Sequence, residues 1–269
     1  MRAKRIIYCC VGILFFISLG FLLCCSPSDK TGVKPGKVWK DPTLGMEFVW
    51  APGGCYEMGC GSRTSECQEH ERPEHTVCVS GFWIGKYEVT QGQWKGLMGD
   101  NPAQFNKCGD NCPVEQVSWN DAVDFAERLS RKTGHTFRLP TEAEWEYACR
   151  SGGMGEKYSG GDNVDAIAWY TNNSGWKTNR VGRKRSNGLG IYDMSGNVWE
   201  WCSDWYANDY YDRSPKDNPQ GSSGGQYRVN RGGSWNDLPG YVRCSNRYGD
   251  WPDNRYYLMG FRLVRVGQK

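Results

Sequence analysis

The C-terminal half of the chain contains the blocks Gly196-Asn-Val-Trp-Glu-Trp201, Arg231-Gly-Gly-Ser-Trp235 and Gly260-Phe-Arg262. Aromatic and β-branched residues gather around these blocks, and Gly, Asn, Asp and Ser are frequent between them. The pattern predicts short strands near residues 198–202, 228–235 and 261–266, joined by long loops. The blocks therefore indicate a loop-rich domain in which Trp side chains form much of the core.

Two helices are predicted upstream from capping boxes, in which Ser or Thr is followed three positions later by an acidic residue. Ser118 and Asp121 open the first helix, and Gly134 ends it. Thr141 and Glu144 open the second helix. The first helix has an apolar face made of Ala122, Phe125, Ala126 and Leu129.

Further upstream, residues 46–58 and 77–89 each predict a pair of strands, the first around a Pro-Gly-Gly turn. The sequence shows no internal repeat and no domain boundary after residue 42. A few strands, two helices and long loops together predict one α+β domain over residues 43–269.

The composition excludes two broad classes of protein. The 269 residues include 13 Trp, and 14% are aromatic, which is too many for a disordered chain. The formal net charge is +3, and the basic run at residues 180–185 contains no aromatic residue. A nucleic-acid interface needs a concentrated basic face, so we expect no nucleic-acid partner and interpret this run as a solvated loop.

The first 25 residues have the pattern of an export signal. Basic residues precede an apolar run over residues 6–23, and Cys25 follows in a Cys-Cys-Ser sequence. The pattern resembles a bacterial lipoprotein signal, and we predict that Cys25 carries lipid. An uncleaved signal anchor is the alternative, because the run is about long enough to span a bilayer. Both interpretations place the rest of the chain outside the cytoplasm, and we expect the outer membrane or cell surface, with residues 26–42 as a flexible tether.

Export permits disulfides, and nine cysteines follow the signal region. Cys108 and Cys112 could close a short loop, and the four cysteines between residues 55 and 78 could cross-link the N-terminal loops. The odd number leaves at least one cysteine unpaired, and we predict that this one is Cys244.

Several ordered segments resemble the formylglycine-generating enzyme family, the sulfatase-modifying factors. They are residues 85–90, 113–122, 137–148, 188–201, 231–235 and 260–262. The resemblance implies a C-type-lectin-like fold, with a small distorted antiparallel sheet, two helices and long surface loops. The family includes oxidases and also binding proteins without catalysis.

The oxidases of this family hold a metal through two cysteines, three and eight residues after the Ser of the Arg-Gly-Gly-Ser sequence. Counting from Ser234 gives Asp237 and Val242 in this chain. Thiolates suit monovalent copper, whereas carboxylate does not and Val offers no ligand. We therefore predict no enzyme activity and no required cofactor. A divergent oxidase that uses Cys244, Cys202 or another metal site is the alternative.

Two further groups of residues contain possible metal ligands. The enzymes of the family hold calcium near the Gly-Asn-Val-Trp-Glu-Trp block, which implies a structural calcium at Asn197, Val198 and Glu200. The alternative is a turn held by Asn197 beside a buried, hydrogen-bonded Glu200. A second group is Cys67, His70 and His75, for which we favour a solvated loop over a zinc site.

Residues 235–259 are rich in Tyr, Asp, Asn, Gly and Ser and contain no Lys, Glu or Gln. Replacing the adenines of an AAC or AAT codon yields Tyr, Asp, Gly or Ser but never those three residues. The segment thus resembles the variable region of proteins diversified by retroelements, which share this fold and end in a similar block. We predict a variable region over residues 231–265, and an invariant loop is the alternative.

On this interpretation the diversified positions form a ligand-binding face, because Tyr and small polar residues also make the contacts of antibody loops. These positions are Asp237, Leu238, Tyr241, Cys244, Tyr248, Gly249, Asp250, Asp253, Tyr256, Tyr257 and Leu258. The interleaved framework positions are Arg243, Arg247, Trp251, Arg255 and Met259. The chain is thus predicted to be a non-catalytic surface lipoprotein that binds a protein or a glycan. An invariant envelope lipoprotein of the same family is a further alternative.

Overall fold

The computed structural model describes residues 32–61 and 66–267. The strands are β1 Val38–Lys40, β2 Glu47–Ala51, β3 Gly54–Met58, β4 His75–Val79, β5 Phe82–Gly85, β6 Phe137–Arg138, β7 Trp199–Trp205, β8 Arg228–Arg231, β9 Arg247–Asp250, β10 Met259–Gly260 and β11 Val264–Arg265. The α-helices are α1 Gln91–Met98, α2 Trp119–Thr133, α3 Glu142–Cys149 and α4 Val164–Ile167. Short 3-10 helices occupy Glu69–Glu71, Asn106–Cys108, Tyr210–Asp212 and Pro239–Tyr241.

The N-terminal predictions fall mostly outside these residues. The signal region and Cys25 lie outside the described part of the chain. Within the described part, every helix is too short or too polar to cross a bilayer. The predicted tether over 26–42 is wrong at its end, because Val38–Lys40 forms β1 and pairs with β2.

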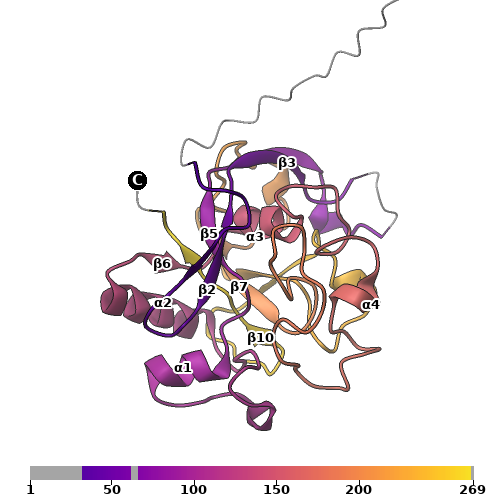
Figure 1. Ribbon diagram of the computed structural model, residues 1–269. Helices are drawn as coiled ribbons and strands as arrows, with labels where there is room; N and C mark the ends of the chain where they lie inside the picture. Colours follow the sequence, from indigo (N-terminus) through magenta and orange to yellow (C-terminus); the bar gives the residue numbers. More distant parts are fainter. Residues whose placement is uncertain (1–31, 62–65, 268–269) are drawn as a thin grey trace, which may run out of the picture.

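A five-stranded sheet in the order β1-β2-β5-β11-β6 joins the two ends of the domain. In Figure 1, α1 and α2 lie together on one side of the molecule and α4 lies on the opposite side. Trp94 of α1 stacks on Phe125 of α2 with ring centroids 5.5 Å apart, and Phe261 contacts both rings edge-on. This apolar cluster attaches both helices to the C-terminal end of the chain.

Both predicted helices are confirmed with their caps. Ser118 caps α2, which ends at Gly134 with φ 73°, and Thr141 caps α3. The predicted apolar face of α2 is buried. Helix α1 escaped the sequence prediction, although Thr90 and Gln93 form the same type of capping box.

The two predicted strand pairs are wrong in their partners. β2 pairs with β5, and β3 pairs with β4. Because Ala51 lies opposite Phe82 and Gly54 opposite Val79, residues 52–53 and 80–81 bend one long ladder instead of reversing the chain. Gly53 permits this bend, since a Cβ on it would lie 2.9 Å from the nitrogen of Gly81.

A four-stranded sheet in the order β10-β7-β8-β9 carries the C-terminal segment. β7, β8 and β11 confirm the strands predicted near 198–202, 228–235 and 261–266. β10 is parallel to β7, and β9 is antiparallel to β8. Within the described residues β9 is an edge strand, in which Arg247 is buried and Tyr248, Gly249 and Asp250 are exposed or half-buried.

Disulfides correct the prediction for Cys244. The four bonds join Cys55 to Cys78, Cys60 to Cys67, Cys108 to Cys112, and Cys149 to Cys244. The short loop and the cross-linked N-terminal loops are confirmed. Cys244, however, is paired, and the free cysteine in the described part is the buried Cys202. Spacing could not reveal this, because Cys149 and Cys244 lie 95 residues apart.

Candidate functional site

The segment from Asp237 to Leu258 exposes most of its predicted contact residues. The exception is Cys244, which is fully buried in its disulfide, so a ligand contact at this position is wrong. The other ten are exposed or half-buried, and we call them the C-terminal face: Asp237, Leu238, Tyr241, Tyr248, Gly249, Asp250, Asp253, Tyr256, Tyr257 and Leu258.

Six of these residues line one hollow beside the four-stranded sheet, which we call the aromatic hollow. Its volume is about 320 Å³. The C-terminal face contributes Asp237, Tyr241, Tyr248, Asp250, Tyr256 and Leu258, and the rest of the lining is Trp199, Asn230 and Met259. The hollow therefore combines an aromatic and aliphatic wall with two carboxylates and one amide.

Asp237 is held through one of its two oxygens. Oδ2 accepts hydrogen bonds from Trp199 Nε1 at 2.9 Å and from the nitrogen and hydroxyl of Ser234 at 2.8 and 2.5 Å. Burial raises the pKa of Asp237, and the hydrogen bonds from Ser234 and Trp199 act in the opposite direction. Oδ1 has no donor among the described residues, so it is available to a ligand.

Asp250 is held in the same one-sided way. Its Oδ1 accepts from Asn254 Nδ2 at 2.6 Å and from the Trp251 nitrogen at 2.8 Å. The Asn254 amide also donates to the hydroxyl of Tyr256 at 3.0 Å, which links the carboxylate to the aromatic wall. Oδ2 of Asp250 has no protein donor within the part of the chain described.

A second hollow of about 560 Å³ adjoins the first and shares Tyr248, Asp250 and Tyr256 with it. Its other lining residues are His70, Tyr206, Asn208, Tyr227, Gly249 and Trp251. Two of the three shared residues, Tyr248 and Asp250, belong to the edge strand β9. Leu238, Asp253 and Tyr257 of the C-terminal face line neither hollow.

The predicted framework positions divide into two groups. Arg243, Arg247 and Met259 are buried. Trp251 is 48% exposed, and Arg255 is exposed in an ion pair with Asp121.

Buried arginines hold the backbone of this C-terminal segment in place through ion pairs. Arg247 donates to both oxygens of Glu142, at 2.7 and 2.8 Å, and Arg243 donates to both oxygens of Glu71, at 2.7 and 2.6 Å. Arg231 is likewise buried in an ion pair with Glu146. Bidentate pairs of this kind define position as well as charge. The surface residues between these arginines therefore sit on a fixed backbone.

The two positions implied for oxidase cysteines offer no thiolate pair. Val242 is fully buried in an apolar cluster, and Asp237 faces the aromatic hollow. Cys244 is oxidised in a disulfide, and burial raises the pKa of the Cys202 thiol well above its ordinary value. A buried thiol with a raised pKa is a poor nucleophile and a poor metal ligand.

The side-chain oxygens of the predicted calcium ligands already have protein donors. Both oxygens of Glu200 accept from Arg262 at 2.6 Å, and one also accepts from Trp145 Nε1 at 2.7 Å. Asn197 Oδ1 accepts from the nitrogen of Asn179 at 2.9 Å, and Asn197 has φ 65°. These contacts fit the alternative of a held turn beside a buried Glu200.

Two carboxylates near Asn197, those of Glu88 and Asp193, each have an unpartnered oxygen within the described part of the chain. Asn197 donates to Glu88 Oε2 at 3.2 Å, whereas Glu88 Oε1 and Asp193 Oδ1 are buried without a partner among the described residues. Burial and the mutual repulsion of these acids raise the pKa of Glu88 well above its usual value, and burial raises that of Asp193 to about 6. Unpartnered carboxylate oxygens are the donors that Ca²⁺ prefers.

The loop with Cys67, His70 and His75 is structural. Cys67 is bonded to Cys60, and the nearby Glu71 is paired with Arg243. The ring of His75 packs on Tyr211 with centroids 4.7 Å apart. The potential ligands are thus engaged in a disulfide, an ion pair and a ring contact.

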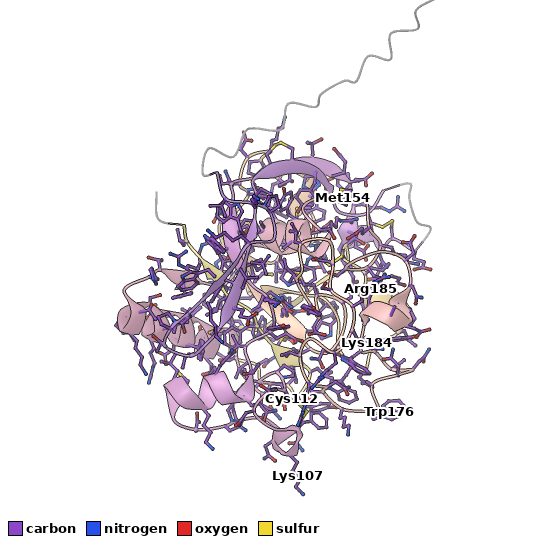
Figure 2. All side chains as sticks on the ribbon, viewed as in Figure 1. Lys107, Cys112, Met154, Trp176, Lys184 and Arg185 are labelled. Carbon is purple, nitrogen blue, oxygen red and sulfur yellow. A yellow bond between two sulfur atoms is a disulfide. The ribbon has the colours of Figure 1, made fainter. Side chains whose placement is uncertain are left out.

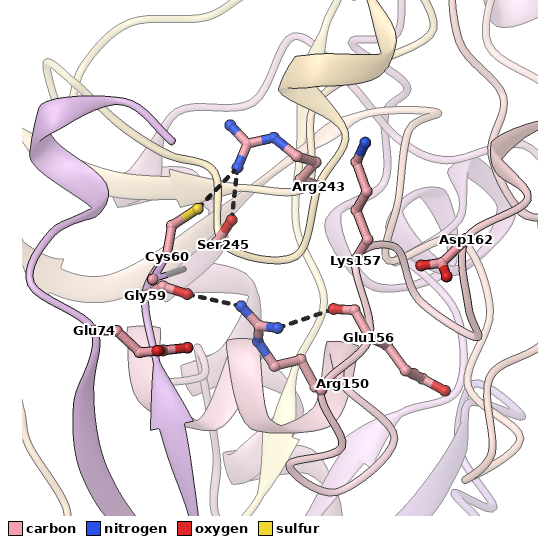
Figure 3. A pocket seen from close by; sticks show the side chains of 11 residues that line it. Gly59, Cys60, Glu74, Arg150, Glu156, Lys157, Asp162, Arg243 and Ser245 are labelled. Carbon is pink, nitrogen blue, oxygen red and sulfur yellow. Dashed lines mark hydrogen bonds between the residues drawn. The ribbon is translucent and has the colours of Figure 1, made fainter. Parts of the chain in front are cut away.

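A polar hollow of about 410 Å³ lies beside the Cys60–Cys67 disulfide (Figure 3). Arg150 donates to the carbonyl oxygens of Gly59 and Glu156 at 2.8 and 2.9 Å. The lining of this polar hollow contains basic residues and also Glu74 and Asp162, so the hollow has no preference for one sign of charge. We assign no ligand to it.

The basic run is attached to neighbouring loops. Lys184 donates to the carbonyl of Asp165 at 2.7 Å and lies over the ring of Trp169, and Arg185 donates to the carbonyl of Gly160 at 2.9 Å. Figure 2 shows both side chains on the same side of the molecule as α4. Their contacts support a structural role for this run.

Comparison with known proteins identifies the family. The chain belongs to the sulfatase-modifying factor enzyme 1-like domain family, which matches residues 34–266. It is 39% identical to the formylglycine-generating enzyme of Streptomyces coelicolor over 305 residues, covering 89% of this chain and 95% of that one. It also matches serine/threonine-protein kinases of Chlamydia trachomatis and Chlamydia caviae, of whose length it spans only 39% and 40%.

Solved structures agree with this assignment. Treponema denticola variable protein 1 is 31% identical, with a TM-score of 0.77 over 86% of this chain and 99% of that chain. PvdO from Pseudomonas aeruginosa is 30% identical, with a TM-score of 0.75 over 87% of this chain and 100% of that chain. The predicted formylglycine-generating-enzyme-like, C-type-lectin-like α+β fold is confirmed.

Proposed function

We propose that this chain is a non-catalytic ligand-binding protein whose C-terminal face contacts a protein or a glycan. The observation that carries the proposal is a pair of adjoining hollows lined by exposed aromatic residues, on a segment fixed from below by buried ion pairs. A face held in place before contact loses less conformational freedom on binding. The similarity to a protein named a variable protein adds support.

The full chain, probed on peptide and glycan arrays, tests this proposal. We expect binding that falls at least about tenfold in the double variant Tyr248→Ala/Tyr256→Ala, because aromatic residues at the centre of an interface carry much of its energy. Trp176→Ala is the matched control, since Trp176 is 67% exposed outside the C-terminal face. Binding that is unchanged in the double variant contradicts the proposal.

The oxidase alternative is tested by copper loading and oxygen consumption with a cysteine-containing peptide. We expect neither tight copper binding nor turnover, because no exposed thiolate pair is present among the described residues. Stoichiometric copper that supports peptide oxidation would overturn the non-catalytic proposal.

We propose in addition that the C-terminal face is diversified by a retroelement. The gene sequence provides the test. A nearby copy of the 3′ coding end that differs only at adenines, beside a reverse transcriptase gene, is expected. If the locus lacks both the near-copy and the reverse transcriptase gene, the chain is an invariant member of the family.

Membrane attachment through lipid at Cys25 is proposed from the sequence alone. Metabolic labelling with a fatty acid should label the chain, and Cys25→Ala should abolish the label while Cys24→Ala keeps it. Protease treatment of intact cells then distinguishes display on the surface from retention in the periplasm.

A structural calcium is proposed near Asn197, held mainly by the unpartnered oxygens of Glu88 and Asp193. A ligand that binds only the folded state raises the melting temperature in proportion to the logarithm of its concentration. Calcium should therefore raise the melting temperature, and Asp193→Asn should remove this effect. An equal response to calcium in the variant argues against the site.

A further inference from the structure

The charges around the aromatic hollow have one sign. Asp237 and Asp250 are acidic, and the described lining contains no Lys, Arg or His. Each carboxylate is oriented by donors to one oxygen and leaves its second oxygen without a protein donor in the described part. Two acids in a concave, partly desolvated site produce a negative potential that favours a cation.

Nearby cations are engaged elsewhere. Arg228 is the register partner of Asp250, but its guanidinium lies between the rings of Trp119 and Trp205, 3.8 and 3.4 Å from their centroids. Arg255 is paired with Asp121 at 2.7 Å. The protein therefore does not neutralise the two acids itself.

The wall of the hollow suits the remainder of a basic side chain. The rings of Trp199, Tyr241, Tyr248 and Tyr256 line it together with Leu258 and Met259. Aromatic faces attract ammonium and guanidinium groups, and apolar surface accepts the methylene stem that carries them. A volume of about 320 Å³ is at the small end of ligand pockets, which fits one side chain.

We propose that the aromatic hollow binds the side chain of a Lys or Arg residue displayed by a partner protein. This inference rests on the proposed function and names the ligand chemistry of the same face. The adjoining second hollow shares Tyr248, Asp250 and Tyr256 and receives the residues that flank the bound side chain. An amino sugar fits less well, because the lining offers only three polar side chains apart from the tyrosine hydroxyls.

Short capped peptides of the form Ala-Ala-X-Ala-Ala test the proposal on the full chain by titration. X is Lys or Arg in one arm, and norleucine or citrulline, their neutral counterparts, in the other. We expect the cationic peptides to bind at least about tenfold more tightly, and to lose several-fold in affinity between low and high salt. Equal affinity for norleucine and Lys, or binding of glucosamine but of neither basic peptide, overturns the inference.

Variants of residues that line the aromatic hollow test whether the basic peptide binds there. Asp250→Asn and Asp237→Asn should each weaken Lys binding by about three- to tenfold, as should Tyr256→Ala, whereas Tyr256→Phe keeps the ring and should bind. Asp162→Asn is the matched control, because it removes the same charge from the polar hollow. Asp250→Asn provides a result even if Asp237→Asn disturbs folding through its bonds to Ser234 and Trp199.

The two proposals fail separately. If norleucine binds as well as Lys, the preference for a cation is wrong and the C-terminal face can still be a binding surface. If array binding is unchanged in Tyr248→Ala/Tyr256→Ala, the face itself is not the binding surface. Lys affinity that is unchanged in both Asp variants also overturns the cation inference.

Discussion

Arginines and tyrosines of the same C-terminal segment have opposite environments. Arg243 and Arg247 are buried to 1% and 0% exposure in pairs with acids from distant parts of the chain, whereas Tyr248 and Tyr256 are 58% and 43% exposed. Arg247 and Tyr248 are adjacent in the sequence, so a single segment contains both kinds of residue. The comparison predicts that substitutions of the arginines change stability, whereas substitutions of the tyrosines change the proposed binding.

The largest loss of unfolding free energy is expected on substitution of the buried arginines. Arg247→Ala leaves Glu142 buried with less compensation and should lower the free energy of unfolding by about 3–5 kcal/mol. Arg255→Ala removes an equally short but exposed pair with Asp121 and should cost at most about 1 kcal/mol. Urea unfolding measures both, and equal losses would contradict the division of the segment.

Removal of the Cys149–Cys244 disulfide comes next. The double variant Cys149→Ala/Cys244→Ala should lose about 2–5 kcal/mol, because this bond closes a loop of 95 residues in the unfolded chain. Replacement of Cys108 and Cys112, which are separated by only 4 positions, should cost less. A smaller loss of unfolding free energy on removal of the Cys149–Cys244 bond than on removal of the Cys108–Cys112 bond would contradict this prediction.

A pH effect of a few kcal/mol or less is expected from Asp204. Burial, with repulsion from Glu142, raises the pKa of this carboxyl to about 7. The folded state then binds the proton more tightly than the unfolded chain, so this contribution to stability is complete below about pH 4 and is lost as pH rises to about 7. Asp204→Asn should flatten melting temperatures over this range. An identical pH profile in the variant would contradict the shift.

The smallest effect on stability is expected at the surface. Tyr256→Ala and Leu238→Ala should each change the free energy of unfolding by about 0.5 kcal/mol or less, since both side chains are exposed. Tyr256→Ala should nevertheless weaken ligand binding, because Tyr256 lines both hollows, whereas Leu238 lines neither. Melting curves combined with array binding test this separation.

Local signals predicted part of the fold, and they missed α1, α4, β1, β6, β9 and β10 of the described residues. The capping residues Ser118 and Thr141 located α2 and α3, and Thr90 with Gln93 could have located α1 by the same rule. Strand pairing was not accessible in this way, because Gly53 and Gly81 bend a ladder whose partners are set by tertiary packing. Local sequence determines where strands form more reliably than which strands pair.

The site shows the same limit. Residue types identified ten positions that are exposed or half-buried in the structure, but they could not distinguish Cys244, whose partner Cys149 is remote in sequence. Nor could they show that Glu200 is engaged by Arg262, or that Trp251 turns outward. The pairing of Cys244 and the engagement of Glu200 both depend on contacts between distant segments.

The cross-link at Cys244 divides the face into two cassettes, residues 237–241 and 248–258, on either side of a fixed point. A display library built on this scaffold can randomise each cassette separately while codons 149 and 244 are held constant. Selected cassettes can then be recombined, because the disulfide attaches the segment between them to the end of helix α3.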